Sequence, residues 1–216
     1  FCLFYCSGRE ADREWDLRHS SVKQAFFKEK FFTYRGKFVH CNPDVWSALA
    51  VFQPDVIITT GFNPTFLVAY AYARLHGAKH IAMTDGTDTT EATLTAVHRF
   101  VRRRVYAGTK AFIGASVGSF ALYRSYGIPD EKMFQSHLCA NNDAFVGQNN
   151  VRGKRYDFVF SARFVPGKNP LFALEVAQAV AQRLGRKVSI LLLGSGEMID
   201  EMRQAAEAMR TDVDAT

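Results

Sequence analysis

The 216-residue sequence has no apolar run close to the ~18 residues that a membrane-spanning helix requires. Its longest apolar run, around 66–73, ends at Arg74. The sequence therefore gives no indication of a membrane-spanning helix.

Cysteine is also scarce, and the residues that could hold a metal are scattered. Four cysteines occur without any CxxC pair, which favours buried free thiols over disulfides or a zinc site. His76 and His80 have metal-like spacing, but Gly77 is predicted to end the helix between them. No metal and no other cofactor are expected. The cysteines are Cys2, Cys6, Cys41 and Cys139.

Charge is moderate, with a net value of +6, and it gathers at Arg99–Arg104. The favoured interpretation is a solvated helix face with cations near its C-terminus, where the macrodipole stabilises them. The alternative is a patch for anionic lipid headgroups or a lipid-phosphate substrate. No basic–aromatic interleaving accompanies the arginines, so nucleic acid is not an expected partner. We expect a cytoplasmic protein, and the alternative would add peripheral contact with the inner face of the membrane.

Strands alternate with helices along the chain, which predicts an α/β protein whose parallel sheets are covered on both faces. Hydrophobic runs and turn residues predict strands at 55–60, 80–84, 110–115, 133–139, 156–162 and 187–193, and helices at 43–52, 64–76, 88–106, 116–127 and 170–184.

An Asn- and Gly-rich stretch at 140–154 interrupts this alternation. We therefore expect a first lobe over 1–148, a linker over 149–155 and a second lobe over 156–216, with substrate bound in a cleft between the lobes. Asn141 and Asn142 are interpreted as turn residues rather than ligands.

Two cations stand where the first strand of the second lobe ends. Arg163 and Lys168 precede Asn169 and Pro170, a predicted N-cap and first-turn proline. Ligands of open α/β sheets sit outside the carboxyl ends of the strands. Cations beside a helix N-terminus are unfavourable unless they share an anion. The pattern predicts a diphosphate site.

The next strand runs into a glycine-rich loop, Gly194-Ser-Gly196-Glu197. Ile199 stands where the third glycine of a dinucleotide fingerprint would be, so the loop is not that motif. A tight turn and a backbone approach to a nucleotide are equally good interpretations, and the second rests on the neighbouring cations.

Asp85 ends a strand of the first lobe, where a carboxylate could orient a sugar hydroxyl or transfer a proton. Ordinary turn chemistry of Asp85-Gly86 is the slightly favoured alternative. Asp88-Thr-Thr-Glu91 has the pattern of a capping box, with Asp88 as the cap.

Four segments in order resemble family 4 retaining glycosyltransferases. FVFSARFVPGKNPLFALEVAQAV is similar to their second-lobe signature, and LLLGSGEM to the following strand and loop. Upstream, PDVIITTGFNP and KAFIGASVGSFALYRSYGIPDEKMFQSHLCANNDAF resemble segments of their first lobe. The resemblance spans roughly residues 54 to 198.

The resemblance implies a GT-B fold with two Rossmann-like lobes, both incomplete here. It implies transfer of a hexosyl group from a UDP- or GDP-sugar to a hydroxyl of a glycan or lipid-linked acceptor, with retention, in surface polysaccharide or glycolipid synthesis. Arg163 and Lys168 match the residues that contact the donor diphosphate and stabilise the leaving group without a metal. Gly194, Gly196 and Glu197 match the loop near the nucleoside, and Asp85 is a candidate catalytic residue on the acceptor side.

The sequence departs from the family pattern in several places. Ala162 replaces a glycine, Thr84-Asp85 stands where many members carry a histidine, and Asn141 stands where an aspartate is usual. Members also open with a strand and Gly-rich loop and carry two glutamates seven residues apart farther on. We expect this chain to lack both features and to be inactive by itself.

Two rivals remain open. A GT-B-like nucleotide-sugar epimerase would bind a similar donor but need carboxylates and a histidine that face the sugar. A non-catalytic nucleotide-binding or scaffold module would use the loop of Arg163 and Lys168 for an anion or for nothing.

Overall fold

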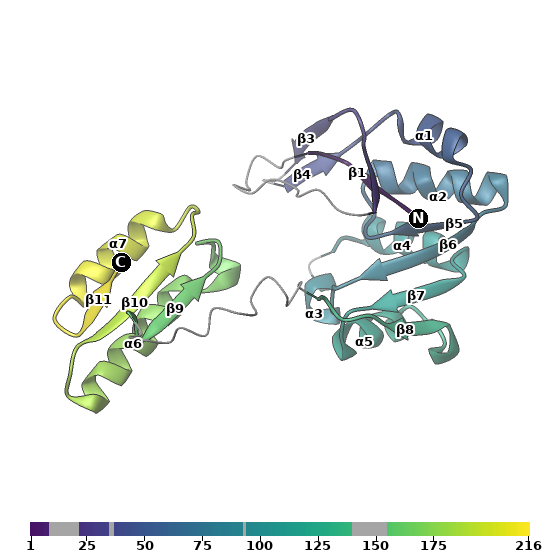
Figure 1. Cartoon of the computed structure of the whole chain (residues 1–216). Coiled ribbons are helices and arrows are strands. Elements are labelled where there is room, and N and C mark those ends of the chain that lie inside the picture. Colours follow the sequence, from purple (N-terminus) through teal and green to yellow (C-terminus); the bar gives the residue numbers. More distant parts are fainter. Residues whose placement is uncertain (9–21, 35–36, 93, 140–154) are drawn as a thin grey trace. The chain divides into compact units, whose positions relative to one another are not determined.

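The computed structural model describes residues 1–8, 22–34, 37–92, 94–139 and 155–216. The chain divides into two compact units, Phe1–Ala140 and Asn141–Thr216, and each is described by itself (Figure 1). The expected linker lies outside the described residues except for Arg155, as do Asn141 and Asn142. The domain boundaries therefore stay predictions.

The first unit contains a four-stranded parallel sheet in the order β5-β6-β7-β8, beside a parallel pair β1-β2 and an antiparallel pair β3-β4. Its strands are β1 (Cys2–Tyr5), β2 (Lys23–Phe26), β3 (Phe31–Tyr34), β4 (Lys37–His40), β5 (Val56–Thr59), β6 (Lys79–Thr84), β7 (Ala111–Gly114) and β8 (Met133–Gln135). Its helices are α1 (Val45–Phe52), α2 (Pro64–His76), α3 (Asp88–Glu91), α4 (Ala96–Ala107) and α5 (Val117–Ser125).

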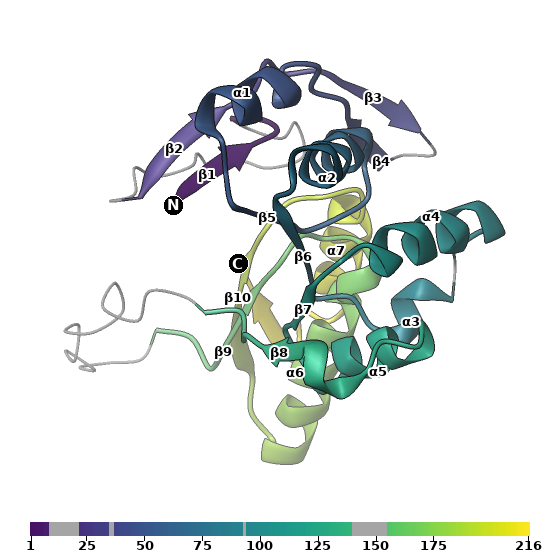
Figure 2. The same ribbon diagram turned by 90° about the vertical axis from the view of Figure 1, so that its right-hand side faces the viewer.

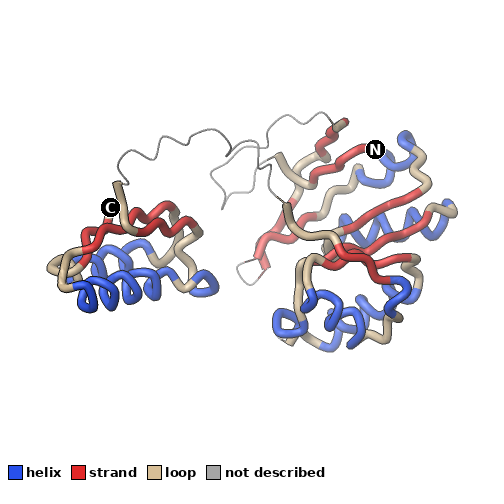
Figure 3. The backbone as a smooth tube through the Cα atoms, turned by 60° about the horizontal axis from the view of Figure 1, so that its bottom comes forward, coloured by secondary structure: helices blue, strands red, loops and turns tan. Residues whose placement is uncertain are grey.

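The second unit is a three-stranded parallel sheet in the order β11-β10-β9. Its elements are β9 (Phe158–Ser161), α6 (Pro170–Leu184), β10 (Val188–Leu193), α7 (Ile199–Ala208) and β11 (Val213–Ala215). Both helices lie on one face of the sheet (Figure 3), where Leu174 and Ile190 are buried. On the other face Val159 is 62% exposed, so covering of both faces is not seen in the described part of this unit.

Local signals place most helix ends as expected. The Asn63 side chain accepts a hydrogen bond from Phe66 N at 3.1 Å and caps α2, which ends at Gly77 with φ 75°. Ser116 caps α5 by accepting from Ser119 N at 3.3 Å. The α/β class with parallel sheets is confirmed.

Two capping predictions are wrong. The capping box starts one residue earlier than expected, because Thr87 and Thr90 bond to each other's backbone N–H and α3 stops after Glu91. The expected helix over 88–106 is therefore two helices, α3 and α4. Asn169 precedes α6 in a left-handed conformation (φ 47°) and its side chain makes no cap bond, although Pro170 occupies the first turn as expected.

The cysteines are free thiols, as predicted, but none of them is buried: Cys2 and Cys6 are partly exposed, and Cys41 and Cys139 are exposed. No helix within the described ranges has the length and apolar character needed to cross a bilayer.

A buried histidine joins three elements of the first unit. The Thr109 hydroxyl donates to Val105 O at 2.9 Å, so it accepts from His80 Nδ1 at 2.8 Å. The other ring nitrogen, Nε2, is then the acceptor for the Thr59 hydroxyl at 2.9 Å. His80 is 1% exposed, and burial lowers its pKa from 6.5 to about 4. The neutral ring is thus part of the fold.

We expect the first unit to lose stability as the pH falls from 6.5 towards 4. In this range His80 binds a proton in the unfolded state but stays neutral in the folded state, so protonation favours unfolding. The full effect is roughly 3 kcal/mol, at about 1.4 kcal/mol per pKa unit. Urea unfolding at several pH values, followed by tryptophan fluorescence, measures it, since Trp46 lies on α1 of this unit and the sequence has no tryptophan after residue 46.

The variant His80→Gln should flatten this pH dependence even if its stability at pH 7 is lower. His98→Gln removes an exposed histidine and serves as the matched control with an unchanged profile. Equal pH dependence in the His80→Gln variant and the parent chain would contradict the assignment.

Candidate functional site

Two loops meet at the carboxyl edge of the sheet in the second unit. One follows β9 and the other follows β10, and backbone hydrogen bonds join them beyond the ends of the strands. Ala162 N donates to Leu193 O at 3.1 Å, Phe164 N donates to Ser195 O at 2.7 Å, and Met198 N donates back to Phe164 O at 3.0 Å. The loops therefore form one rigid edge.

The two glycines of the second loop make this contact sterically feasible. A Cβ at Gly194 would lie 2.0 Å from Ala162 O, and one at Gly196 would lie 2.4 Å from Phe164 O. Gly196 also has φ +149°, a backbone conformation that residues with a side chain rarely adopt. The role of the two glycines that the structure supports is thus to allow the close approach of the two loop backbones. Their role in donor binding is a proposal.

Phe164 anchors the loop that carries the two cations. Its side chain is 3% exposed and packs into the core of the second unit with residues such as Leu174. Arg163, the residue before it, is exposed. A turn follows directly, in which Val165 N donates to Arg163 O at 3.0 Å.

Lys168 ends a short 3₁₀ turn, Pro166–Lys168, and it is exposed as well. Its backbone N donates to Val165 O at 2.9 Å, which holds the turn directly ahead of the first residue of α6, Pro170. The structure thus places both cations in one exposed loop that leads into the N-terminus of a 15-residue helix. Such a helix end carries a partial positive charge and unpaired N–H groups, so the arrangement suits an anion.

Glu197 follows the glycine loop and is exposed at the same edge. It lies directly before Met198, whose backbone N binds the first loop. The structure thus brings Arg163, Gly194, Gly196 and Glu197 to one pair of loops, with Lys168 in the continuation of the first.

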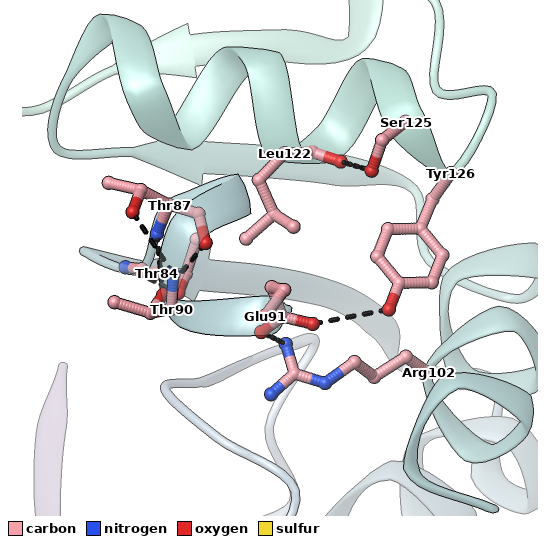
Figure 4. Close-up of polar contacts among 9 residues, drawn as sticks. Thr84, Thr87, Thr90, Glu91, Arg102, Leu122, Ser125 and Tyr126 are labelled. Atoms are coloured by element: carbon pink, nitrogen blue, oxygen red, sulfur yellow. Dashed lines mark hydrogen bonds and ion pairs between the residues drawn. The ribbon is translucent and has the colours of Figure 1, made fainter. Parts of the chain in front are cut away.

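The first unit presents Asp85 at the carboxyl end of β6. Thr84 shapes the turn, because its hydroxyl accepts from Gly86 N at 3.0 Å (Figure 4). Its carbonyl accepts from Ala115 N at 3.1 Å. Asp85 is exposed, and its carboxylate has no hydrogen bond or ion pair among the residues that the structure describes. It is available to a ligand of the first unit.

An ion pair that sequence reasoning missed holds the helix behind this turn. Glu91 on α3 pairs with Arg102 on α4, and the Tyr126 hydroxyl donates to Glu91 Oε2 at 3.1 Å (Figure 4). The guanidinium carbon of Arg102 also lies 4.5 Å from the centre of the Phe62 ring. Burial and the neighbouring Glu91 carboxylate raise the pKa of Tyr126. Figure 2 shows α3, α4 and α5 grouped together in this region.

The interpretation of the whole arginine run as a solvated face needs correction at one residue. The side chain of Arg102 is only 16% exposed and that of Glu91 only 12%. Arg99, Arg103 and Arg104 are exposed. No sequence signal distinguishes Arg102 from its neighbours.

Within the described part of the chain, no three His, Cys, Asp or Glu side chains are grouped so that they could hold a metal ion. Asp85 and the second-unit residues belong to separate units, so each group is considered as a site by itself.

No family model and no curated protein match this sequence. Solved structures do match its fold. HepE from Anabaena in complex with UDP has a TM-score of 0.61 and 12% identity, over 90% of this chain and 55% of its own. TarM has a TM-score of 0.59 and 12% identity, over 80% of this chain and 35% of its own. A mutant of S. aureus TarM in complex with Fondaparinux, alpha-GlcNAc-glycerol and UDP has a TM-score of 0.53 and 11% identity, over 84% and 37%.

These likenesses confirm the GT-B fold class. The chain spans about half the length of HepE and about a third of the length of TarM.

We expect Gly194→Ala to destabilise the second unit by about 1–3 kcal/mol, because the new methyl group would overlap Ala162 O. Hydrogen exchange followed by mass spectrometry on peptides from β9 and β10 measures the change. Gly167→Ala is the matched control in the same region, since a Cβ there meets nothing within 4 Å. Equal exchange in both variants would show that the loops are not in contact.

Proposed function

We propose that this chain is the nucleotide-sugar-binding part of a GT-B glycosyltransferase. It would support transfer of a hexosyl group from a UDP- or GDP-sugar to an acceptor hydroxyl. The observation that carries the proposal is the exposed loop of Arg163 and Lys168, which lies at the carboxyl edge of the sheet and leads into α6. The fold likeness to GT-B glycosyltransferases supports it.

The two cations have a defined chemical task in such a reaction. Cleavage of the sugar–phosphate bond leaves negative charge on the diphosphate, and positioned cations stabilise charge that develops in the transition state. Arg163 can bind two phosphate oxygens in a forked geometry, and Lys168 adds a compact charge. The N–H groups at the start of α6 add their dipole. We propose that these groups suffice for leaving-group stabilisation without a metal.

UDP is the better candidate for the nucleotide. HepE has been crystallised with UDP, with UDP and glucose, and with UDP-glucose, and a TarM mutant with UDP. GDP is the alternative. Gly196 and Glu197 are the proposed neighbours of the nucleoside because they border the cation loop.

Asp85 is the proposed acceptor-side residue. Its exposed carboxylate, at the end of β6 in the first unit, can accept a hydrogen bond from a sugar hydroxyl or take its proton. Retention of anomeric configuration, membership of family 4, a glycan or lipid-linked acceptor, and a role in surface polysaccharide or glycolipid synthesis all follow from the sequence resemblance and are part of the proposal.

Calorimetric titration of UDP and GDP tests the donor site. The double variant Arg163→Ala, Lys168→Ala should weaken UDP binding at least about a hundredfold, since each charge-assisted contact contributes about 1.5–3 kcal/mol. Arg183→Ala, Lys187→Ala removes the same charge from exposed positions near the other end of α6 and should bind like the parent.

Equal binding by both double variants would overturn the site assignment. Incubation of the parent with UDP-sugars in the absence of acceptor tests the rival activity, because conversion of the sugar to its epimer would identify an epimerase.

We also propose that α4 contacts anionic lipid, on the cytoplasmic face of a membrane. Its outward residues combine apolar and basic character: Val97 is 70% exposed, Phe100 is 56% exposed, and Arg103 and Arg104 are exposed beside them. The guanidinium carbon of Arg104 lies 5.0 Å from the centre of the Phe100 ring. Helices with this combination lie at the boundary between headgroups and acyl chains.

The double variant Arg103→Gln, Arg104→Gln should bind vesicles that contain phosphatidylglycerol with roughly thirtyfold lower affinity, because each basic residue contributes about 1 kcal/mol. Sedimentation of the protein with the vesicles measures this affinity. Arg102 is left intact because it supports the fold. Arg203→Gln, Arg210→Gln removes two exposed charges elsewhere and is the control. Equal binding to neutral and anionic vesicles would refute the proposal.

A further inference from the structure

The hairpin of β3 and β4 exposes aromatic side chains on both of its faces. β3 and β4 pair only with each other among the described residues. Phe31 is 44% exposed and Phe32 is 52% exposed. Successive residues of a strand point to opposite faces, so each face of β3 presents one of these rings. A two-stranded hairpin has little stability of its own in water, and exposed apolar surface of this kind marks a contact site.

Hydrogen bonds to the backbone hold the segment that leads into the hairpin. Lys28 N donates to Asp44 Oδ2 at 2.8 Å, and Lys28 O accepts from the buried Asn42 side chain at 2.8 Å. Cys41 N donates to Lys30 O at 2.9 Å, where the end of β4 returns to the start of β3. The root of the hairpin is thus fixed to the rest of the first unit, while the side chains of Lys28 and Lys30 are exposed.

Basic side chains surround this root, together with a further aromatic ring. Phe26, at the end of β2, is 50% exposed and stacks on Tyr5 with ring centres 5.1 Å apart. Glu29 is the only acidic residue in the segment 22–34, and its carboxylate accepts a hydrogen bond from the Ser7 hydroxyl at 2.5 Å. The segment therefore presents an excess of positive charge. Its exposed lysines are Lys23, Lys28 and Lys30.

Aromatic rings and cations together suit two anionic partners, a single-stranded nucleic acid and a lipid bilayer. Bases of a nucleic acid stack on aromatic rings that lie along one groove or platform. Phe31 and Phe32 belong to opposite faces of β3, so they do not form such a platform. The interface of a bilayer, in contrast, surrounds a hairpin, accepts aromatic rings on both faces and offers phosphates to lysines. The arrangement favours the bilayer.

We propose that the hairpin β3-β4 inserts Phe31 and Phe32 into the interface of an anionic bilayer, with the three lysines on headgroup phosphates. The inference rests on membrane contact by the first unit, which is part of the proposed function. Figure 2 shows the hairpin and α4 extending towards the same side of this unit. One helix on a membrane leaves a protein free to rotate about the helix axis. Two separate contacts fix the orientation of the first unit on the surface.

Quenching by brominated lipids tests the insertion. The vesicles contain phosphatidylglycerol with bromine on its acyl chains, and the signal of the parent chain is subtracted. In the variant Phe32→Trp, the fluorescence of the added indole should fall at least about twofold, because it lies at the membrane interface. The matched control is Phe172→Trp on α6, at a position that is 56% exposed in the second unit, and it should not be quenched. Equal quenching of both variants, or quenching of neither, would overturn the insertion.

Vesicle sedimentation separates the contributions of charge and of the apolar rings. Lys28→Gln, Lys30→Gln should lower the affinity for phosphatidylglycerol vesicles roughly thirtyfold, at about 1 kcal/mol per basic residue. Phe31→Ser, Phe32→Ser should lower it at least about tenfold through loss of buried apolar area. The lysine variant changes exposed side chains alone, so it keeps the test decisive if the phenylalanine variant unfolds. Unchanged affinity in the lysine variant, with Arg203→Gln, Arg210→Gln as the charge control, would overturn the proposal.

The two membrane contacts fail in distinguishable ways. Loss of binding in Arg103→Gln, Arg104→Gln, with full binding by the hairpin variants, would keep α4 and overturn the hairpin. The reverse result would support the hairpin and overturn α4, and no binding of the parent to anionic vesicles would overturn both. Tighter binding to a poly(dT) oligonucleotide than to vesicles, lost in Lys28→Gln, Lys30→Gln, would identify a nucleic acid as the partner and overturn the bilayer. The donor site is tested separately by the UDP titration.

Discussion

The cation loop of the second unit depends on a contact in which two backbones touch with no side chain between them. Phe164 N and O both bond to the loop after β10, and Gly194 and Gly196 leave the space that this requires. Phe164 fills the core from the same segment. The backbone on both sides of Arg163 is therefore held in place before any ligand binds. For the proposed diphosphate site, a backbone that is held in advance reduces the reorganisation that binding requires, which favours electrostatic stabilisation.

Features that depend on a few neighbouring residues could be predicted from the sequence. Asn63, Ser116 and Gly77 act within one helical turn, so the starts of α2 and α5 and the end of α2 were correctly expected. Arg163 and Lys168 could be placed at a sheet edge because a strand, a short loop and a helix follow in order. Asn169 failed as a cap because the preceding 3₁₀ turn sets its left-handed backbone, and a capping side chain needs an extended one.

Features that depend on distant partners could not be predicted. Arg102 stands among similar arginines, and only tertiary packing gives it Glu91 on α3 and Phe62, in the loop before α2, as neighbours. The interruption of the first-unit sheet between β1 and β5 is likewise invisible in the sequence, because it depends on which strands pair with each other.

Asn42 has a consequence for the cooperativity with which the first unit opens. Its side chain joins the segments after β1 and β2, at Cys6 O and Lys28 O, to Thr65 in α2. Both N–H donors and the oxygen of this side chain are hydrogen-bonded. If one of the three segments moves away, the buried amide loses a partner, which weakens the whole network. The pair β1-β2 and the sheet β5-β6-β7-β8 share no strand pair, yet the buried Asn42 side chain links the segments that follow β1 and β5. The two sheets should therefore open as one cooperative unit, with a common opening free energy for the amides of β1 and α2 in native-state hydrogen exchange.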